Sequence, residues 1–352
     1  MSPAKVQPPQ EKASVDEPSE STATLAEIAR AAGVSAPTVS KVLNGRADVA
    51  PGTRTRVEEL LLRHGYRRRR GASQQSQLID LVFHELDSAW AMEVVRGVEN
   101  VAREEGLSLV LSESAGRLTP GQTWVDGVLA RRPAGVILVL SDLDAAQRAQ
   151  LTSRSIPFVV VDPAGDPGDD IPSVGAANWQ GGLAATRHLT GLGHRRVGII
   201  GAGPHDVQPR APGRLPRRPG DLRCADGSRV GPGGRVQPRG RLQAALELLR
   251  LPEPPTAVFA GNDLQALGVY EAARELGLRI PEDLSVVGFD DLPLTRWIGP
   301  PLTTVRQPLI EMAETAARLV LDLGRGRQPA TTRVDLATSL VVRSSTAPPA
   351  QR

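Results

Sequence analysis

The sequence predicts two structural units: an N-terminal all-α helix-turn-helix domain and a larger, two-lobed α/β domain built on doubly wound parallel sheets. Three observations lead to this prediction. Residues 24–45 read as two short, capped helices joined by a tight turn. From residue 78 onward, apolar strand runs alternate with amphipathic helices, which is the pattern of parallel sheets covered on both faces. Residues 24–72 carry a net charge of +6, whereas the whole chain carries only +3.

The first 23 residues differ from everything that follows. They are polar, rich in Pro, Ser and Glu, and without apolar periodicity, so we expect a disordered tail. This tail carries a charge of −2, and the 280 residues after the basic unit carry −1. A small basic unit ahead of a near-neutral body is typical of a polyanion-binding head on a domain with another task.

Three helices are predicted in the basic unit. Thr24 and Glu27 form a capping box at the start of the first helix, and Gly33 ends that helix in a left-handed conformation. Ser35 caps the second helix, and a third runs over residues 51–63. Two short helices joined at a Gly-Val turn and braced by a third form either a helix-turn-helix or a plain three-helix bundle.

The α/β domain is predicted from its alternating segments. In the first lobe, strands are expected at residues 78–83, 107–112, 135–140 and 158–162, separated by helices at 90–106, 121–132 and 144–153. A second series begins at residue 173 and resumes near residue 256. Two α/β lobes follow from this pattern, and ligands of open α/β sheets bind beyond the carboxyl ends of the strands.

Several functional classes are disfavoured by the sequence. No stretch approaches the roughly 18 consecutive apolar residues of a membrane span, and the N-terminus has no apolar signal core, so we expect a cytoplasmic protein. Cys224 is the only cysteine, and the five histidines lack metal-ligand spacing; neither a metal nor a cofactor is expected. The run GIIGAG does not continue as a phosphate loop, and no nucleophile elbow or Walker lysine is present, so catalysis is not expected.

Long strings in both units are similar to one known family. These strings are TLAEIARAAGVSAPTVSKVLNG and VAPGTRTRVEELLLRHGY in the head, and LTGLGHRRVGIIG, AGNDLQALGVYEAARELGLRIPEDLSVVGFDD and PLTTVRQP in the larger domain. They resemble the LacI/GalR family of bacterial transcription regulators. The resemblance implies a helix-turn-helix over residues 24–66 and a periplasmic-binding-protein-like effector and dimerisation domain over residues 78–345. It also implies a homodimer on a pseudo-palindromic double-stranded DNA operator, and a small-molecule effector that is commonly a sugar.

The resemblance also assigns DNA-binding roles by matched position. Base-edge contacts fall on Ala36, Pro37 and Lys41, and phosphate contacts fall on Thr24, Ser35, Thr38, Ser40 and Asn44. A lysine donates to guanine O6 and N7, whereas an alanine packs on a thymine methyl group. Phosphate contacts fix the register of the protein without reading sequence. The alternative for Ser35 is a helix cap alone, and for Thr38 a solvated surface position.

The linker, residues 67–77, departs from the family pattern. Family members place a short hinge helix here and insert an apolar side chain into the minor groove, but RRRRGASQQSQ contains no large apolar residue. Arg67 and Arg68, with the two arginines that follow, either contact phosphates or a narrow minor groove, or belong to a flexible charged linker.

The effector-binding residues are likewise assigned by position in the family. They are Ser88, Trp90, Asp162, Asn262, Asp290 and Gln307. Carboxylates and carboxamides at strand ends can make paired hydrogen bonds to vicinal hydroxyls, and an aromatic face can stack on a sugar. For Asp162 and Asp290 the alternative is a turn or a helix cap, while Asp263 and Asp291 are expected to brace the local backbone.

One window does not fit the alternating pattern. Of the 38 residues in 204–241, 9 are Arg, 7 Pro and 7 Gly, and the window is expected to lack the helix and strand required there. Of the 42 basic residues in the chain, 39 are arginine. This composition indicates a GC-rich gene, and GC-rich DNA read out of frame encodes Arg, Pro and Gly. The window is either a pair of compensating frameshifts or a genuine disordered insert. Resequencing the codons for residues 200–245 distinguishes the two.

The sequence as a whole predicts a DNA-binding transcription regulator, a repressor by family resemblance, located with the nucleoid and controlled by an effector held between two lobes. The alternatives are a sugar-binding protein without a regulatory role and a regulator with defective effector sensing. The sequence leaves open the identity of the effector, its action as inducer or co-repressor, the operator sequence, and the choice between dimer and tetramer.

Overall fold

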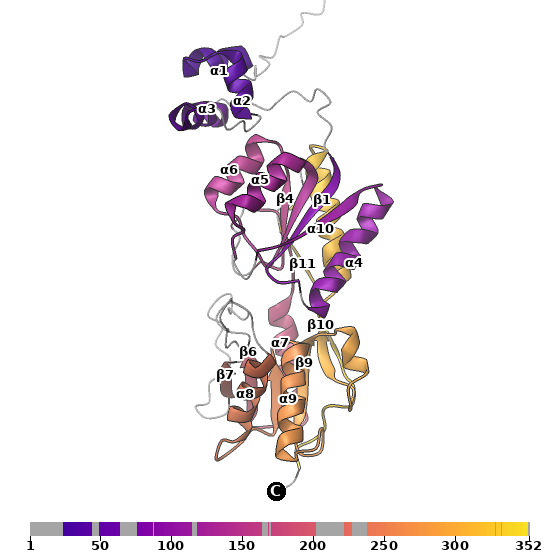
Figure 1. Cartoon of the computed structure of the whole chain (residues 1–352). Helices are drawn as coiled ribbons and strands as arrows, with labels where there is room; N and C mark the ends of the chain where they lie inside the picture. The colour runs from indigo at the N-terminus through magenta and orange to yellow at the C-terminus, as the bar shows by residue number, and fades with distance from the viewer. Residues whose placement is uncertain are drawn as a thin grey trace, which may run out of the picture. The chain divides into compact units, whose positions relative to one another are not determined.

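The computed structural model describes residues 24–43, 49–63, 76–86, 88–114, 118–163, 168, 170–201, 222–226, 238–327, 329–331 and 333–350. The chain divides into two compact units, residues 1–71 and 72–352. The first unit contains only helices among its described residues, and the second contains two six-stranded sheets (Figure 1). The predicted fold class, a helix-turn-helix followed by a two-lobed α/β domain, is therefore confirmed.

The N-terminal unit consists of α1 (Leu25–Ala32), α2 (Ala36–Leu43) and α3 (Pro51–Arg63). The predicted capping box is present, because the Thr24 hydroxyl accepts from the amide of Glu27 and the Glu27 carboxylate accepts from the amide of Thr24. Gly33 closes α1 with φ of 66°. A small apolar core joins the three helices, centred on the fully buried Ile28, Val39 and Val57.

The first lobe is built on a wholly parallel sheet with the strand order β11-β5-β4-β3-β1-β2. Its strands are β1 (Ser76–Phe83), β2 (Ser108–Glu113), β3 (Pro133–Val139), β4 (Phe158–Val161), β5 (Ser173–Ala176) and β11 (Arg333–Leu336). Its crossover helices are α4 (Ala89–Glu104), α5 (Gln122–Arg131) and α6 (Ala145–Ser153). The four strands predicted in this lobe lie within two residues of the observed bounds.

The second lobe repeats this arrangement with the strand order β12-β10-β9-β8-β6-β7, in which only β12 runs antiparallel to its neighbour. Its strands are β6 (Val197–Gly201), β7 (Leu222–Asp226), β8 (Ala257–Ala260), β9 (Ser285–Asp290), β10 (Thr303–Arg306) and β12 (Ser339–Val341). Its helices are α7 (Asn178–Gly191), α8 (Pro238–Leu249), α9 (Asp263–Leu276) and the 3₁₀ turn η1 (Pro293–Arg296). In both sheets the strand order reverses between the first and the third strand in sequence, which are β1 and β3 in the first lobe and β6 and β8 in the second. Such a reversal is the switch point of a doubly wound sheet.

The chain passes between the two sheets three times, and these crossovers interlock the lobes. After β5 it enters α7, which packs on the second sheet through Ala185 and Leu189. After β10 it enters α10 (Leu309–Gly324), which returns to the first sheet and lies beside α4 (Figure 1). The α4–α10 approach requires Gly97, since a Cβ there would lie 2.5 Å from the carbonyl oxygen of Ile310. The third crossover joins β11 to β12.

The expectation for the Arg/Pro/Gly-rich window is wrong in one respect. The window contains strand β7, which pairs in parallel with β6 at the edge of the second sheet, and α8 begins inside it at Pro238. Composition averaged over the window hid a proline-free stretch, residues 220–231, within which β7 lies. An edge strand needs main-chain partners on one side only, and proline is tolerated in the first turn of a helix. The described residues of the window, 222–226 and 238–241, all belong to β7 or α8. The second sheet therefore keeps its full core order.

Candidate functional site

The exposed face of α2 carries the residues predicted to contact DNA bases. Ala36, Pro37 and Lys41 are exposed, whereas Val39 and Val42 on the opposite face are buried. The residue spacing produces this division, because positions three and four apart share one face of a helix. A short helix with one face buried and one basic, small-residue face exposed has the geometry of a major-groove recognition helix.

The residues predicted to contact phosphates lie at helix starts and beside this face. Ser35 caps α2, since its hydroxyl accepts from the amide of Thr38 at 3.3 Å and lies 2.8 Å from the Thr38 hydroxyl. Thr24 caps α1 and is exposed, and Ser40 is half-buried. The helix-cap alternative for Ser35 is therefore realised, and capping leaves its hydroxyl on an exposed residue. Asn44, Arg67 and Arg68 lie outside the described residues.

Two predicted effector contacts occupy matching places in the two lobes. Asp162 follows β4, the fourth strand of the first core sheet, with φ of 49°, and Asp290 ends β9, the fourth strand of the second, with φ of 106°. Non-glycine residues in this region cost about 1–3 kcal/mol each and persist where the surrounding structure holds them. Among the described helices, α7 has Ala177 and η1 has Leu292 at the N-cap position. Neither aspartate is therefore the N-cap residue of these helices, and a turn is the alternative to effector contact that fits their positions.

A continuous chain of hydrogen bonds links three of the predicted effector residues. The indole N–H of Trp90 donates to Oε1 of Gln307 at 3.1 Å, and Nε2 of Gln307 donates to Oδ1 of Asn178 at 2.8 Å. Nδ2 of Asn178 lies 3.4 Å from Oδ1 of Asp162. Gln307 and Asn178 lie on two of the crossovers between the lobes. The series of hydrogen bonds therefore extends from the first turn of α4, across both crossovers, to the end of β4.

Asn178 takes part in this series of hydrogen bonds, but the sequence analysis did not predict it as a site residue. It is the first residue of α7, and its carboxamide bonds to both Gln307 and Asp162. An asparagine at a helix start normally signals a cap, which hides any further role. A carboxamide in this position offers both a donor and an acceptor to a polyhydroxylated ligand.

Ser88 and Asn262 have local structural roles in addition to their predicted one. The Ser88 hydroxyl accepts from the amide of Ala91 at 3.1 Å and caps α4, and Oδ1 of Asn262 accepts from the amide of Gln265 at 2.8 Å and caps α9. Helix α4 starts after the carboxyl end of β1 in the first sheet, and helix α9 starts after the carboxyl end of β8 in the second. Capping satisfies one hydrogen-bonding position of each side chain and leaves the remaining positions for a ligand.

Among the described residues, no group of three or more His, Cys, Asp or Glu side chains is placed to hold a metal ion. Within the same part of the chain, no helix combines the length and apolar character that a bilayer crossing requires.

A helix-turn-helix head joined to a pair of doubly wound lobes, with polar side chains gathered at strand ends and crossovers, defines a ligand-responsive DNA-binding regulator. Family models agree with this class. Residues 24–69 match the model described as bacterial regulatory proteins, lacI family. Residues 76–206 match periplasmic binding proteins and sugar binding domain of LacI family, and residues 186–346 match a periplasmic binding protein-like domain.

Curated relatives cover nearly the whole chain. The HTH-type transcriptional repressor CytR of Escherichia coli (strain K12) is 32% identical over 337 residues, which span 93% of this chain and 97% of that protein. The HTH-type transcriptional repressor PurR of Erwinia tasmaniensis is 30% identical over 342 residues, 92% of this chain and 97% of that one. The chain therefore belongs to the lacI family of bacterial regulatory proteins.

Solved structures show the same architecture. A transcriptional regulator CelR in complex with cellobiose matches with a TM-score of 0.63 and 27% identity, covering 92% of this chain and 99% of that chain. The lac repressor dimer bound to operator and the anti-inducer ONPF matches with a TM-score of 0.59 and 28% identity, covering 93% of this chain and all of that one (100%).

Proposed function

We propose that this chain is a sequence-specific DNA-binding repressor that acts as a homodimer and whose operator affinity is controlled by a small-molecule effector, most simply a sugar. The observation that carries this proposal is the presence, in one chain, of an exposed recognition helix and of a polar hydrogen-bond chain at the lobe crossovers. The CytR and PurR relatives are named as repressors, and the CelR and lac repressor structures contain cellobiose or an anti-inducer. No catalytic activity is part of the proposal, and its place of action is the cytoplasm, with the chromosome.

The DNA-binding part of the proposal rests on α2. Ala36, Pro37 and Lys41 read base edges, and Thr24, Ser35, Thr38, Ser40 and Asn44 contact phosphates, with Arg67 and Arg68 adding charge along the linker. Two such heads in a dimer would read half-sites about 34 Å apart, which is one helical turn of DNA. The operator is therefore expected to be a near-palindrome, and selection of bound sequences from random duplexes identifies it.

Replacing Lys41 by alanine should weaken binding to the selected operator by about 1–3 kcal/mol per half-site, because a base-edge or phosphate contact is lost. The slope of log affinity against log salt should also become shallower by about one unit per half-site. A fluorescence-anisotropy titration at several salt concentrations measures both. Arg274→Ala, at an exposed position of α9, is the matched control and should bind as wild type; unchanged affinity and slope for Lys41→Ala would contradict the assigned docking.

The effector-binding part rests on the strand ends and crossovers. Ser88, Trp90, Asp162, Asn262, Asp290 and Gln307, joined by Asn178, are the proposed contacts. Trp90 donates to Gln307, Gln307 donates to Asn178, and Asn178 donates to Asp162, so the hydroxyl groups of a ligand can replace these bonds without leaving the polar groups unpaired. Since Gln307 and Asn178 stand on the crossovers, this exchange changes contacts at the points where the lobes are joined. Such couplings are typically about 1–3 kcal/mol, or about 5- to 150-fold in DNA affinity.

A thermal-shift panel of D-ribose, D-glucose, cellobiose and adenosine tests effector binding. At least one compound should raise the melting temperature of wild type, since a ligand that binds only the native state stabilises it. Gln307→Ala and Asn178→Ala should each reduce that shift, because each removes hydrogen bonds to hydroxyl groups worth about 0.5–1.5 kcal/mol apiece. Operator binding in the absence of ligand should remain. A wild-type chain that binds operator but responds to no member of a wider sugar and nucleoside panel would indicate a regulator without effector sensing.

A further inference from the structure

Two consecutive aspartates at the end of β9 adopt left-handed backbone conformations. Asp290 has φ of 106° and Asp291 has φ of 58°. L-residues with a Cβ avoid this region, so two in succession need support from neighbouring groups. The direction in which the Asp290 side chain leaves the strand end follows directly from this backbone conformation.

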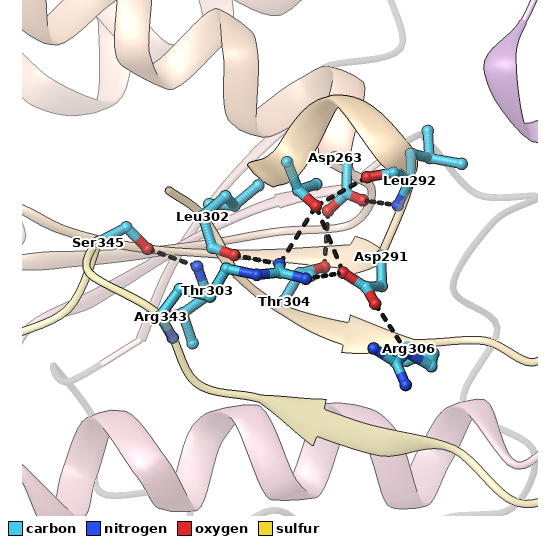
Figure 2. A network of polar contacts seen from close by, with 10 residues as sticks. Asp263, Asp291, Leu292, Leu302, Thr303, Thr304, Arg306, Arg343 and Ser345 are labelled. Carbon is cyan, nitrogen blue, oxygen red and sulfur yellow. Dashed lines mark hydrogen bonds and ion pairs between the residues drawn. The ribbon is translucent and has the colours of Figure 1, made fainter. Parts of the chain in front are cut away.

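The first support is a buried ion-pair cluster around Asp291. Its Oδ1 accepts from the Arg343 guanidinium and, at 3.3 Å, from the Thr295 hydroxyl, and its Oδ2 accepts from Nε of Arg306 at 2.7 Å. The Asp291 side chain is only 2% exposed and that of Arg343 14%. Figure 2 shows Arg343 and Arg306 reaching the same carboxylate from different sides.

Arg343 connects this carboxylate to the rest of the second lobe. Its guanidinium also donates to the carbonyl oxygen of Leu302 at 2.6 Å and to the Thr295 hydroxyl at 3.1 Å, and its amide donates to the Thr303 hydroxyl at 2.9 Å. The arginine therefore ties the segment after β9 to the start of β10 and to the chain after β12. A planar guanidinium with several fixed donors suits such a junction better than an ammonium group.

The second support is the fully buried carboxylate of Asp263 in α9. Its Oδ2 accepts from the amide of Leu292 at 2.7 Å and its Oδ1 from the Thr304 hydroxyl at 2.6 Å (Figure 2). The carboxylate lies over Gly288 of β9, where a Cβ would come within 2.3 Å of Oδ1. Residue 288 must therefore be a glycine for Asp263 to reach the backbone that follows the aspartate pair.

We propose that Asp263, Asp291 and Arg343 form a positioning clamp that holds residues 290–292 in this backbone conformation and thereby aims Asp290 at the effector. This inference rests on the proposed function of Asp290 as an effector contact. The carboxylates of Asp263 and Asp291 are buried, the Arg343 side chain is 14% exposed, and all three groups are hydrogen-bonded to protein atoms. They therefore act through the backbone rather than by touching the ligand. The clamp spans α9, the end of β9, the start of β10 and the chain after β12, which makes the site dependent on residues far from it in sequence.

The test compares Arg343→Gln, Arg343→Lys and Asp291→Asn with the control Arg274→Gln, whose exposed ion pair with Glu271 lies on α9. The first readout is the crystal structure of each folded variant, which needs no ligand. The second is the dissociation constant for D-ribose, D-glucose, cellobiose and adenosine, measured individually by calorimetry. Arg306→Gln removes only the outer, half-exposed partner of Asp291 and serves if the Arg343 variants do not fold.

In Arg343→Gln and Asp291→Asn, residues 290 and 291 should leave the left-handed region, and the ligand bound by wild type should bind about 10- to 100-fold more weakly, as expected for a lost charged hydrogen bond. Arg343→Lys, which keeps the charge, should fall between these variants and wild type. The control should match wild type in both readouts. An unchanged backbone in Arg343→Gln, or a changed backbone with unchanged ligand affinity, would overturn the clamp. If wild type binds none of the compounds, the effector proposal fails for them, while the variant backbones still decide whether the clamp holds residues 290–292.

Discussion

Arg131→Ala should lower the free energy of unfolding of the C-terminal unit by about 3–5 kcal/mol, because it leaves the fully buried carboxylate of Asp80 without its partner. Asp80 is fully buried in β1, an interior strand of the first sheet that lies between β3 and β2. Arg131, the last residue of α5, holds it with two hydrogen bonds: NH2 to Oδ1 at 2.6 Å and Nε to Oδ2 at 3.2 Å. Urea denaturation followed by circular dichroism measures the loss.

The double variant Asp80→Val, Arg131→Met is the control for this prediction. Replacing both members of a buried ion pair by apolar groups is often neutral or stabilising, because the desolvation cost of both charges disappears. Val82 and Val136 beside Asp80 already provide an apolar face. The double variant should therefore be at least as stable as wild type to within about 1 kcal/mol. If the single substitution cost no more than an ordinary surface change, the pair would not carry the stability assigned to it.

The stability of the second lobe should fall as pH rises toward neutrality, and Asp263 is the reason. Burial raises the pKa of Asp263 to about 7 from 3.8, against the opposing effect of its hydrogen bonds from Thr304 and Leu292; nearby Asp291 raises it further and Arg343 lowers it. Because the folded-state pKa lies above the unfolded value, the folded state binds the extra proton between these two pH values. This contribution is fully present below about pH 4 and is lost as pH rises through 7.

Between pH 5 and pH 8, Asp263 alone should lower the free energy of unfolding by about 2–3 kcal/mol. Asp263→Asn removes the titrating group while keeping an acceptor for the Leu292 amide. The difference in unfolding free energy between this variant and wild type should therefore shift in favour of the variant by that amount from pH 5 to pH 8. Parallel urea titrations at the two pH values measure the shift, and a constant difference would show that Asp263 is already ionised at pH 5.

Local sequence patterns predicted the elements that depend on neighbours within one helix or strand. The capping box of Thr24 and Glu27 and the left-handed Gly33 follow from residues three to nine positions apart, and both are confirmed. The bracing roles expected for Asp263 and Asp291 are also seen in their hydrogen bonds. The prediction for residues 204–241 was wrong about β7, because average composition says little about a short edge strand held by main-chain hydrogen bonds.

Local sequence patterns did not predict the contacts between residues that are far apart in the sequence. Trp90 and Gln307 are separated by 217 positions, Gln307 and Asn178 by 129, and Asp80 and Arg131 by 51. No periodicity within an element encodes such pairs, since they exist only after the strands are ordered and the chain has crossed between the sheets. Asn178 is the clearest case, because in sequence it is one polar residue at the start of a helix.

The sequence by itself determined the two-unit organisation, the helix-turn-helix, the alternating α/β pattern and the family, because these depend on local spacing and on long matching strings. The tertiary structure alone decided how the crossovers interlock the lobes and which polar groups meet at the strand ends. It also decided how two buried aspartates and an arginine hold the backbone beside Asp290. The physical reason is that hydrogen bonds and ion pairs act over a few ångströms, and only the folded chain brings these residues within that distance.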